Sequence, residues 1–368
     1  MKIPFVSFLE MHQPIKMEMQ QAFSDFYDKS WFVLGDGVKQ FEQSYAAFNQ
    51  ITNCVGVSNG LDALHIALRA LGIGEGDEVI VPSNTYIATL LACSYVGATP
   101  VLVEPSIDTY NIDPALIEPA ITSKTKAIMP VHLYGQCCEM EAIMQIANKH
   151  NLFVVEDNAQ AQGAAYNNKL TGTWGNINGT SFYPGKNLGA LGDAGAITTN
   201  DVKLAEKAYL LRNYGSQKKY FNEVIGYNMR LDELQAVFLE IKLKHLPHWT
   251  KQRQQLATCY NEALQNIKDI ILPVTANNAT HVYHIYVIRT RHRDALQKHL
   301  NGNGIGTLIH YPIPPHLQEA YKSLGYKRGD LPIAEEIAET CLSLPIWPGM
   351  EKREIEYISD IIKLYYEK

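Results

Sequence analysis

Apolar positions in the first half of the chain follow two alternating patterns, one typical of buried strands and one typical of amphipathic helices. Between residues 53 and 156, short apolar runs rich in β-branched residues alternate with segments of helical period. The expected strands are residues 53–58, 78–82, 100–104, 127–131 and 152–156, and the expected helices open or lie at residues 59–68, 85–96, 114–121 and 139–150. This order predicts an α/β fold, with a largely parallel sheet covered by helices on both faces.

The two ends of the chain follow other patterns. Residues 12–49 indicate two helical pieces separated by a packed turn at residues 31–37. Residues 231–268 are also helical in pattern, with a break expected near Pro247 because proline lacks the N–H that a helix needs. The remaining expected elements are strands at residues 178–183, 196–199, 282–289 and 306–309, and helices at residues 201–212, 293–302, 331–341 and 351–367.

The length of the chain allows more than one domain. With 368 residues it can bury a large core, and the late mixture of short strands and helices indicates a smaller C-terminal α+β unit. We predict a large domain at residues 12–245 and a small domain at residues 246–368 that also includes residues 1–11. Residues 213–230 have no clear period and mix aromatic, amide and basic groups, which favours a functional loop.

Charge and cysteine content exclude several classes of protein. The net charge of -6 comes from 38 acidic and 32 basic residues without long runs, so no basic surface for nucleic acid or anionic lipid is expected. The 6 cysteines form no C-x-x-C pair and no zinc spacing. The segment at residues 3–9 is too short and proline-broken for a signal peptide. We therefore expect free thiols and a cytoplasmic protein.

Two glycine-rich segments do not carry a nucleotide fingerprint. Residues 72–76 and 302–306 both precede expected strands, whereas a dinucleotide-binding loop follows a strand and opens a helix. Both segments are interpreted as turns.

Three other segments contain candidate functional residues at the ends of expected strands. The turn Ser58–Asp62 opens a helix and can hold an anion on its backbone amides, or can be an ordinary N-cap. Asp157 follows an apolar strand, where a buried carboxylate needs backbone donors or a cationic partner, and Gln160 can reach the same ligand. Lys186 lies among glycines and apolar groups, a setting that favours a neutral amine able to react with a carbonyl, or it can be an ordinary solvated lysine of a loop.

Together these segments suggest a ligand with an anion, a basic ring nitrogen and an aldehyde. Pyridoxal 5'-phosphate (PLP) has all three groups, and a lysine holds its aldehyde as a Schiff base. Tyr86 follows another strand and is a candidate to stack on the ring, although it can equally line the cleft.

With these motifs in order, the chain resembles the DegT/DnrJ/EryC1/StrS sugar-nucleotide aminotransferases along nearly its whole length. The segments that carry the resemblance are Ser58–Leu64, Glu156–Gln160, Ser181–Lys186, Asn228–Asp232 and His310–Pro312. The resemblance implies the fold type I architecture of PLP-dependent transferases, with a large domain built on a mostly parallel seven-stranded sheet. It also implies a homodimer.

The resemblance also implies roles for single residues. Lys186 would form the Schiff base, Asp157 would pair with the pyridine nitrogen, Gln160 would contact the ring hydroxyl and Tyr86 would stack on the ring. The phosphate would be held by the residues Gly60, Leu61, Ser181 and, from a second subunit, Asn228. Many relatives have histidine where this chain has Gln162, and relatives with histidine in place of the lysine act as dehydratases. The presence of Lys186 favours amino transfer.

Substrate contacts and substrate class form the last set of predictions. Tyr183, His310 and Tyr311 are candidates for the sugar, with packing of the small domain as the alternative for the last two, and Lys219 is a candidate for the diphosphate or a solvated lysine. Residues 183–190 resemble members that aminate the 3-keto position of dTDP-linked 6-deoxyhexoses, with an amino acid such as L-glutamate as donor. A 4-keto-sugar or keto-cyclitol aminotransferase and a non-catalytic regulator that binds PLP or a sugar nucleotide are the alternatives.

Overall fold

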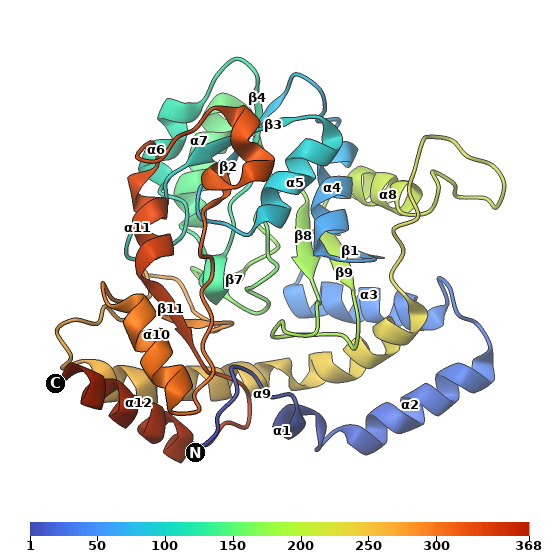
Figure 1. The fold of residues 1–368 in the computed structure, drawn as a ribbon. Helices are drawn as coiled ribbons and strands as arrows, with labels where there is room; N and C mark the ends of the chain where they lie inside the picture. The colour runs from blue at the N-terminus through green and yellow to red at the C-terminus, as the bar shows by residue number, and fades with distance from the viewer. Residues whose placement is uncertain (368) are drawn as a thin grey trace.

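The computed structural model describes residues 1–367 and contains two groups of strands that form the centre of the fold (Figure 1). One group is a parallel sheet in the order β3-β2-β4-β5, with β2 (Glu78–Pro82), β3 (Thr99–Val103), β4 (Thr125–Ile128) and β5 (Phe153–Val154). The other has the order β1-β9-β8, with β1 (Asn53–Val57), β8 (Asn178–Ser181) and β9 (Gly195–Thr199), and β9 is antiparallel to both neighbours.

Asp157 joins the two groups. It forms parallel bridges to Val131 on one side and to Gly179 on the other. The neighbouring Asn158 N donates to Gly179 O at 2.8 Å. The strands therefore follow one order, β3-β2-β4-β5-β8-β9-β1, which confirms the mostly parallel seven-stranded sheet.

Helices cover both faces of this sheet because its strand residues alternate between two cores. On one face α4 (Gly60–Ala70), α5 (Ile87–Val96) and α8 (Val202–Leu211) pack against Val55, Val79 and Ile197. On the other face lie α3 (Asp36–Asn49), α6 (Pro114–Ile117), α7 (Met140–His150) and α9 (Glu233–Leu264). The predicted α/β layering is confirmed.

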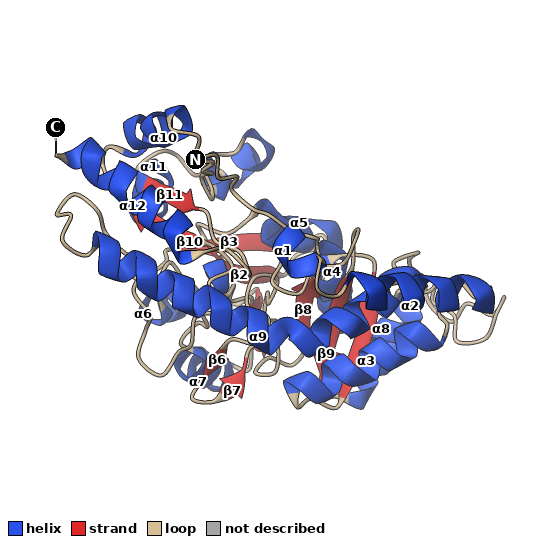
Figure 2. Ribbon diagram, turned by 90° about the horizontal axis from the view of Figure 1, so that it is seen from below, coloured by secondary structure: helices blue, strands red, loops and turns tan. Residues whose placement is uncertain are grey.

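The long helix α9 differs from the sequence prediction. It contains 32 residues and continues through Pro247, so the expected break is wrong. Proline removes one backbone hydrogen bond, but buried Leu246 and Trp249 on either side of it keep packing against the body. Figure 2 shows α9 running unbroken along the underside of the molecule. The proposed boundary at residue 245 falls inside α9, and the division into domains stays a prediction.

The C-terminal part forms a second core around Ile3 and the ends of several helices. Its elements are β10 (Tyr286–Arg289), α10 (Arg293–Gly302), α11 (Pro332–Thr340), β11 (Cys341–Leu344) and α12 (Lys352–Tyr366), with β10 antiparallel to β11. The prediction of a strand at residues 306–309 is wrong. Gly306 N donates to Ile3 O at 2.8 Å, but Leu308 pairs with Ser343 in a different part of the chain. The segment divides its hydrogen bonds between two neighbours and forms no continuous ladder.

The strand expected at residues 282–289 is shorter than predicted. It begins at Tyr286, because Val282 N donates to Gly135 O at 2.8 Å instead of joining the ladder. The other short elements are α1 (Leu9–His12), α2 (Lys16–Lys29), β6 (Ala165–Tyr166), β7 (Lys169–Leu170) and four 3-10 turns at Glu118–Ala120, Leu133–Gly135, Pro315–Leu317 and Glu319–Leu324. Among the helices of residues 1–367, none has the length and apolar content needed to cross a membrane.

Candidate active site

Lys186 lies in a turn at residues 182–190, called the lysine turn below, that follows the carboxyl end of β8. Lys186 N donates to Tyr183 O at 2.8 Å, and Ala190 N returns to Phe182 O at 2.8 Å, so the turn is closed by its own backbone. Gly189 is required inside it, because a Cβ there would lie 2.3 Å from Pro184 O. Gly189 therefore allows the tight turn that carries Lys186.

The environment of Lys186 favours its neutral form. Its side chain is half-buried, and burial lowers the pKa of Lys186 to about 8, whereas the nearby Asp157 carboxylate acts in the opposite direction. At neutral pH the amine loses its proton at much lower cost than a surface lysine. This is the property needed of an amine that reacts with a carbonyl.

Asp157 lies beside this lysine in the centre of the sheet. It is 5% exposed, and its carboxylate accepts from Thr89 Oγ1 at 2.8 Å and from Ala159 N at 3.1 Å. Burial raises the pKa of Asp157, and these two donors, with Lys186, lower it. Thr89 was missed by the sequence reasoning, although it lies one helical turn after Tyr86 in an expected helix and hence on the same side.

Residues far apart in the chain meet Gln160. Its Oε1 accepts from Tyr134 N at 2.7 Å, and its Nε2 donates to Tyr311 OH at 3.1 Å. The ring of Tyr311 lies 5.2 Å from that of Tyr86, tilted by 35°. The structure thus brings three of the predicted residues, Tyr86, Gln160 and Tyr311, into contact with one another, and this group is called the wall of the site below.

His310 belongs to the same wall. Its Nδ1 lies 2.8 Å from Ser343 Oγ, and its carbonyl accepts from the hydroxyl of Tyr134. Burial, with the positive charge of Lys186, lowers the pKa of His310 to about 4. Burial also lowers the pKa of His284, with Lys186 again contributing. The imidazoles around Lys186 are therefore neutral, and the sequence reasoning gave no sign of His284.

The start of α4 meets the end of β8 beside the lysine turn. Asn59 caps α4, with Oδ1 accepting from Asp62 N at 2.8 Å, so the N-cap interpretation is confirmed. It does not exclude anion binding, because within residues 1–367 the amides of Gly60 and Leu61 have no acceptor. A Cβ on Gly60 would lie 2.5 Å from Ser181 Cβ, so the two elements touch here.

Gln162 links the Asp157 side of the site to the Ser181 side. It is fully buried, and its Nε2 donates to Ser181 O at 2.7 Å and to Ala159 O at 3.4 Å. Its Oε1 has no partner within the described chain. Gln162 therefore connects two segments that the sequence separates by about twenty residues.

The other predicted residues lie away from this wall or at its rim. Tyr183 is 58% exposed beside the lysine turn. Asn228 and Lys219 are exposed and belong to the segment between α8 and α9, which extends from the body as a loop at the right of Figure 1. The side chains of Asn228 and Lys219 make no hydrogen bond in residues 1–367.

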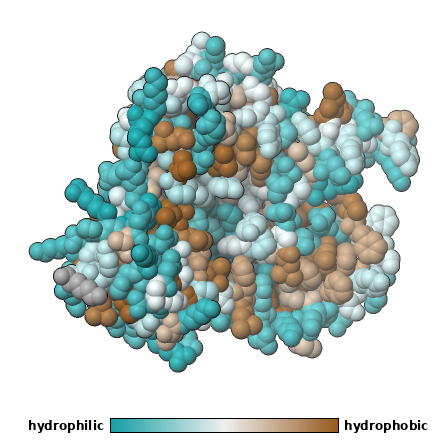
Figure 3. Space-filling model, in the orientation of Figure 1, coloured by the Kyte–Doolittle hydropathy of each residue, from teal (hydrophilic) through white to brown (hydrophobic). Residues whose placement is uncertain are grey.

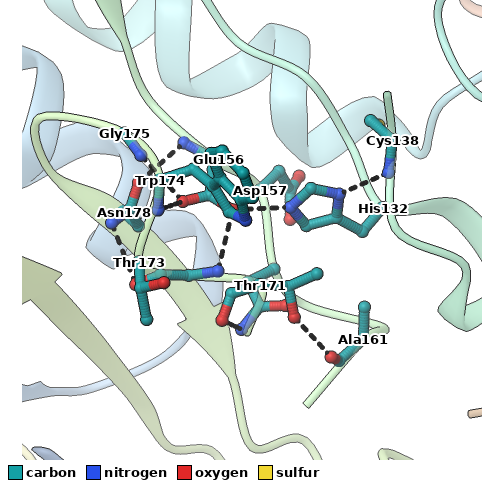
Figure 4. A network of polar contacts seen from close by, with 12 residues as sticks. His132, Cys138, Glu156, Asp157, Ala161, Thr171, Thr173, Trp174, Gly175 and Asn178 are labelled. Carbon is teal, nitrogen blue, oxygen red and sulfur yellow. Dashed lines mark hydrogen bonds and ion pairs between the residues drawn. The ribbon is translucent and has the colours of Figure 1, made fainter. Parts of the chain in front are cut away.

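Glu156, next to Asp157, has a structural role. Its carboxylate accepts from the backbone amides of Gly172, Trp174 and Gly175 at 2.8, 2.6 and 2.9 Å (Figure 4). It also accepts from His132 Nε2 at 2.8 Å, since His132 Nδ1 accepts from Cys138 N. The two adjacent acidic residues therefore point to different surroundings, and Glu156 holds a loop while Asp157 faces the site.

The residues of the site fit PLP. Asp157 is a buried carboxylate with two neutral donors, and its oxygens can accept a hydrogen bond from a protonated ring nitrogen. A lysine of lowered pKa and two acceptor-free amides at a helix N-terminus match the aldehyde and the phosphate.

Comparisons with known proteins agree with this geometry. Residues 13–363 match the DegT/DnrJ/EryC1/StrS aminotransferase family. The chain is 52% identical over 363 residues to the dTDP-3-amino-3,6-dideoxy-alpha-D-galactopyranose transaminase of Aneurinibacillus thermoaerophilus, with 99% of each protein covered.

Two solved structures are similar over nearly the whole chain. Streptomyces venezuelae DesV, in complex with a ketimine intermediate, has a TM-score of 0.98 at 46% identity and covers 100% of this chain and 99% of its own. NtdA of Bacillus subtilis, with bound cofactor PMP, has a TM-score of 0.90 at 32% identity, covering 98% of this chain and 85% of its own. The chain therefore belongs to the DegT/DnrJ/EryC1/StrS aminotransferase family and is a PLP-dependent aminotransferase of fold type I.

Proposed function

We propose that this protein transfers an amino group from an amino acid, L-glutamate first among the donors to test, to the C-3 keto group of a dTDP-linked 3-keto-6-deoxyhexose. The observation that carries the proposal is the buried Asp157 beside a lysine of lowered pKa. The substrate class is supported by a relative that is 52% identical over 99% of both chains and is named a dTDP-3-amino-sugar transaminase. Such an enzyme serves the biosynthesis of aminodeoxy sugars.

The residues of the site would hold PLP as follows. Lys186 Nζ would bind the aldehyde carbon, Asp157 would pair with the ring nitrogen and Gln160 would contact the ring hydroxyl. Tyr86 would cover the ring, and the amides of Gly60 and Leu61 with the Ser181 hydroxyl would bind the phosphate. When bound, PLP supplies an electron sink for the charge that develops at the reacting carbon.

Lys186 would also move the protons of the reaction. Once displaced by the amino donor, its Nζ takes the proton from the donor α-carbon, and later delivers a proton to C-3 of the sugar. A pKa of about 8 for Lys186 allows both transfers near neutral pH. Asp157 stabilises positive charge at the ring nitrogen throughout.

Four residues are proposed to bind the sugar nucleotide. Tyr183 lies in the lysine turn, whereas His310 and Tyr311 belong to the group of residues around Gln160, and these three would present hydroxyl and imidazole groups to the sugar. His310 is neutral, because burial lowers the pKa of His310 to about 4, and it therefore acts by hydrogen bonding. Lys219, on the projecting loop, would meet the diphosphate.

Product analysis tests the substrate class. The holoenzyme is incubated with L-glutamate and, separately, dTDP-linked 3-keto and 4-keto 6-deoxyhexoses, a UDP-linked 3-keto sugar and a keto-cyclitol. The proposal expects the dTDP-linked 3-amino sugar as the preferred product. Turnover of the 4-keto sugar alone would overturn it. Glutamate without sugar provides a separate control, since a non-catalytic regulator would leave the visible absorbance of bound PLP unchanged.

We further propose that the active protein is a homodimer. Helix α2 has no buried residue in the single chain, and Tyr27, Trp31 and Phe32 near it are 64%, 66% and 52% exposed. Figure 3 shows apolar side chains gathered at the lower right, where Figure 1 places α2. The projecting loop has further exposed apolar groups, with Phe221 at 61% and Ile225 at 87%. Such exposed apolar surface favours a partner subunit.

A mixing experiment tests whether the second subunit completes the site. Lys186→Ala and Asn228→Ala proteins are each expected to be inactive or weak, the second through loss of a phosphate contact from Asn228 of the partner subunit. After unfolding and refolding together, mixed dimers contain one intact site, so about a quarter of wild-type activity should return. Recovery of no activity, with mixed dimers present by mass, would contradict the shared site.

A further inference from the structure

A second lysine lies beneath the turn that carries Lys186. Lys242, in the N-terminal third of α9, is 0% exposed, and its Nζ donates to Gly189 O at 2.7 Å. Within residues 1–367 no carboxylate forms an ion pair with it. Its neighbours on the buried side of α9, Leu239, Leu243 and Leu246, belong to an apolar core.

An unpaired lysine in an apolar core is costly. An ammonium group out of water destabilises the fold unless it is paired, and an aliphatic side chain of similar length would avoid that cost. Burial accordingly lowers the pKa of Lys242 to about 8, and burial, together with the charge of Lys242, lowers the pKa of His12 to about 4. Within the described chain Lys242 makes one hydrogen bond, to Gly189 O, and this contact is the feature to explain.

Gly189 occupies the closing end of the lysine turn. Ala190 N bonds to Phe182 O at 2.8 Å and thereby closes the loop of chain that contains Lys186. At Gly189 the backbone is pressed against Pro184 O, where no side chain fits. The carbonyl of Gly189 points to α9, and Lys242 is its donor. Without this donor the carbonyl would be buried and unsatisfied, at a cost of about 1–3 kcal/mol for a typical polar group.

We propose that Lys242 is a positioning residue for amino transfer: by holding the Gly189 carbonyl from α9, it fixes the turn that aims Lys186 Nζ toward Asp157. This inference rests on the role proposed for Lys186 above. It concerns the chain's own geometry, so it applies whichever keto sugar is the substrate. A misplacement of about 1 Å at a reacting group lowers rates by about 100-fold.

The test uses two variants of Lys242 and one matched control. Lys242→Met keeps the length of the side chain but removes the donor, and Lys242→Gln keeps an N–H donor without the charge. The control is Lys244→Met, at a lysine on the same helix whose side chain is 61% exposed. Three quantities are measured: the melting temperature of the apoprotein, the pH dependence of borohydride trapping of PLP on Lys186, and kcat and KM for the accepted sugar. Trapping is read by mass spectrometry of the peptide that contains Lys186.

The expected pattern separates positioning from general stability. Lys242→Met should lower kcat by about 10–100-fold, change the KM for the sugar less than about twofold and shift the pH midpoint of trapping. Lys242→Gln should restore most of kcat and the wild-type midpoint, and Lys244→Met should match the wild type throughout.

Several outcomes would overturn the proposal. The first is that Lys242→Met keeps the kcat and the trapping midpoint of the wild type. The second is a loss of activity no larger than the loss of folded protein. The third is failure of both Lys242 variants to fold, which would show that Lys242 is needed for folding. A failure of the proposed function can be recognised in the wild-type protein itself. Borohydride would then trap PLP on a lysine other than Lys186, or the substrate panel would give a different product.

Discussion

At the scale of single residues, the site depends on two ionisable groups placed in opposite environments. Burial lowers the pKa of Lys186 to about 8 and raises that of Asp157, and the charge of each group partly opposes the shift of the other. The lysine can therefore be neutral, and the hydrogen-bond donors that lower the pKa of Asp157 favour a charged carboxylate that can pair with a cationic group. Thr89, which donates to Asp157, supports that charged form.

Removal of the Lys186 amine is the most direct test of its role. Lys186→Ala should abolish the visible absorbance of lysine-bound PLP and lower kcat at least about 100-fold, because both the covalent link and the proton transfer are lost. Absorption spectra and steady-state rates provide the measurement. Lys203→Ala, at an exposed position, is the control and should behave as the wild type. A variant that retains both absorbance and turnover would refute the assignment.

Lys219 gives a prediction about the substrate. Lys219→Glu should raise the KM for the nucleotide sugar about 10-fold or more, because an attraction to the diphosphate becomes a repulsion, while the KM for the amino donor stays unchanged. The neighbouring exposed Lys218→Glu variant, whose ammonium lies 4.8 Å from the Phe221 ring, controls for net charge. Equal effects of the two substitutions would show that Lys219 makes no specific contact.

At the scale of elements, the site is the meeting point of strand ends and one helix N-terminus. β5 leads into Asp157, β8 into Ser181 and Lys186, and α4 begins at Gly60 against Ser181. α9 supports the lysine turn from the opposite face through Lys242. Several elements therefore set the geometry together, and a change where two of them touch should affect binding more than folding.

Gly60 offers such a change. A Cβ there would lie 2.5 Å from Ser181 Cβ, so Gly60→Ala must push α4 and β8 apart. We expect the dissociation constant of PLP to rise at least about 10-fold, equivalent to about 1.4 kcal/mol, because the phosphate loses aligned amides. PLP titration of the apoprotein by fluorescence checks this. Gly302→Ala, where nothing lies within 4 Å, is the control, and equal PLP affinity in both variants would contradict the prediction.

At the scale of the whole molecule, neutral buried histidines link stability to pH. Burial lowers the pKa of His281 to about 3 and of His310 to about 4, and that of His284 well below its usual value. As pH falls from about 6.5 to about 4, the unfolded chain takes up protons that the folded chain does not. Stability is therefore lost as pH falls through this window, opposed by Asp157, whose raised pKa acts in the other direction.

The resulting prediction concerns the apoprotein between pH 7.5 and pH 5. Each fully buried histidine should contribute a loss of up to about 1.4 kcal/mol per pH unit below about 6.5. His281→Asn keeps an acceptor for Tyr283 N, which donates to His281 Nδ1 at 2.9 Å, and should show a smaller fall in melting temperature. Calorimetry at several pH values measures both proteins. An identical pH dependence would show that His281 does not contribute.

Much of the fold could be predicted from the sequence. The strand and helix order through residue 156 was confirmed with ends shifted by a few residues, because burial on a sheet or on one helix face imposes a local period. The failures lie where distant contacts outweigh local propensity. α9 passes through Pro247 because its buried face continues, and no strand forms at 306–309 because its hydrogen bonds go to two partners.

The sequence by itself determined the type of fold and the candidate reacting groups. Asp157 and Lys186 each follow a strand, and the carboxyl ends of parallel strands lie at one edge of a sheet. Only the tertiary structure decided which groups meet them. Thr89 reaches Asp157, Tyr311 reaches Gln160, and Lys242 reaches the lysine turn, across separations of 68, 151 and 53 residues. The physical reason is that local periodicity records which face of an element is buried, whereas such contacts depend on how complete elements pack together.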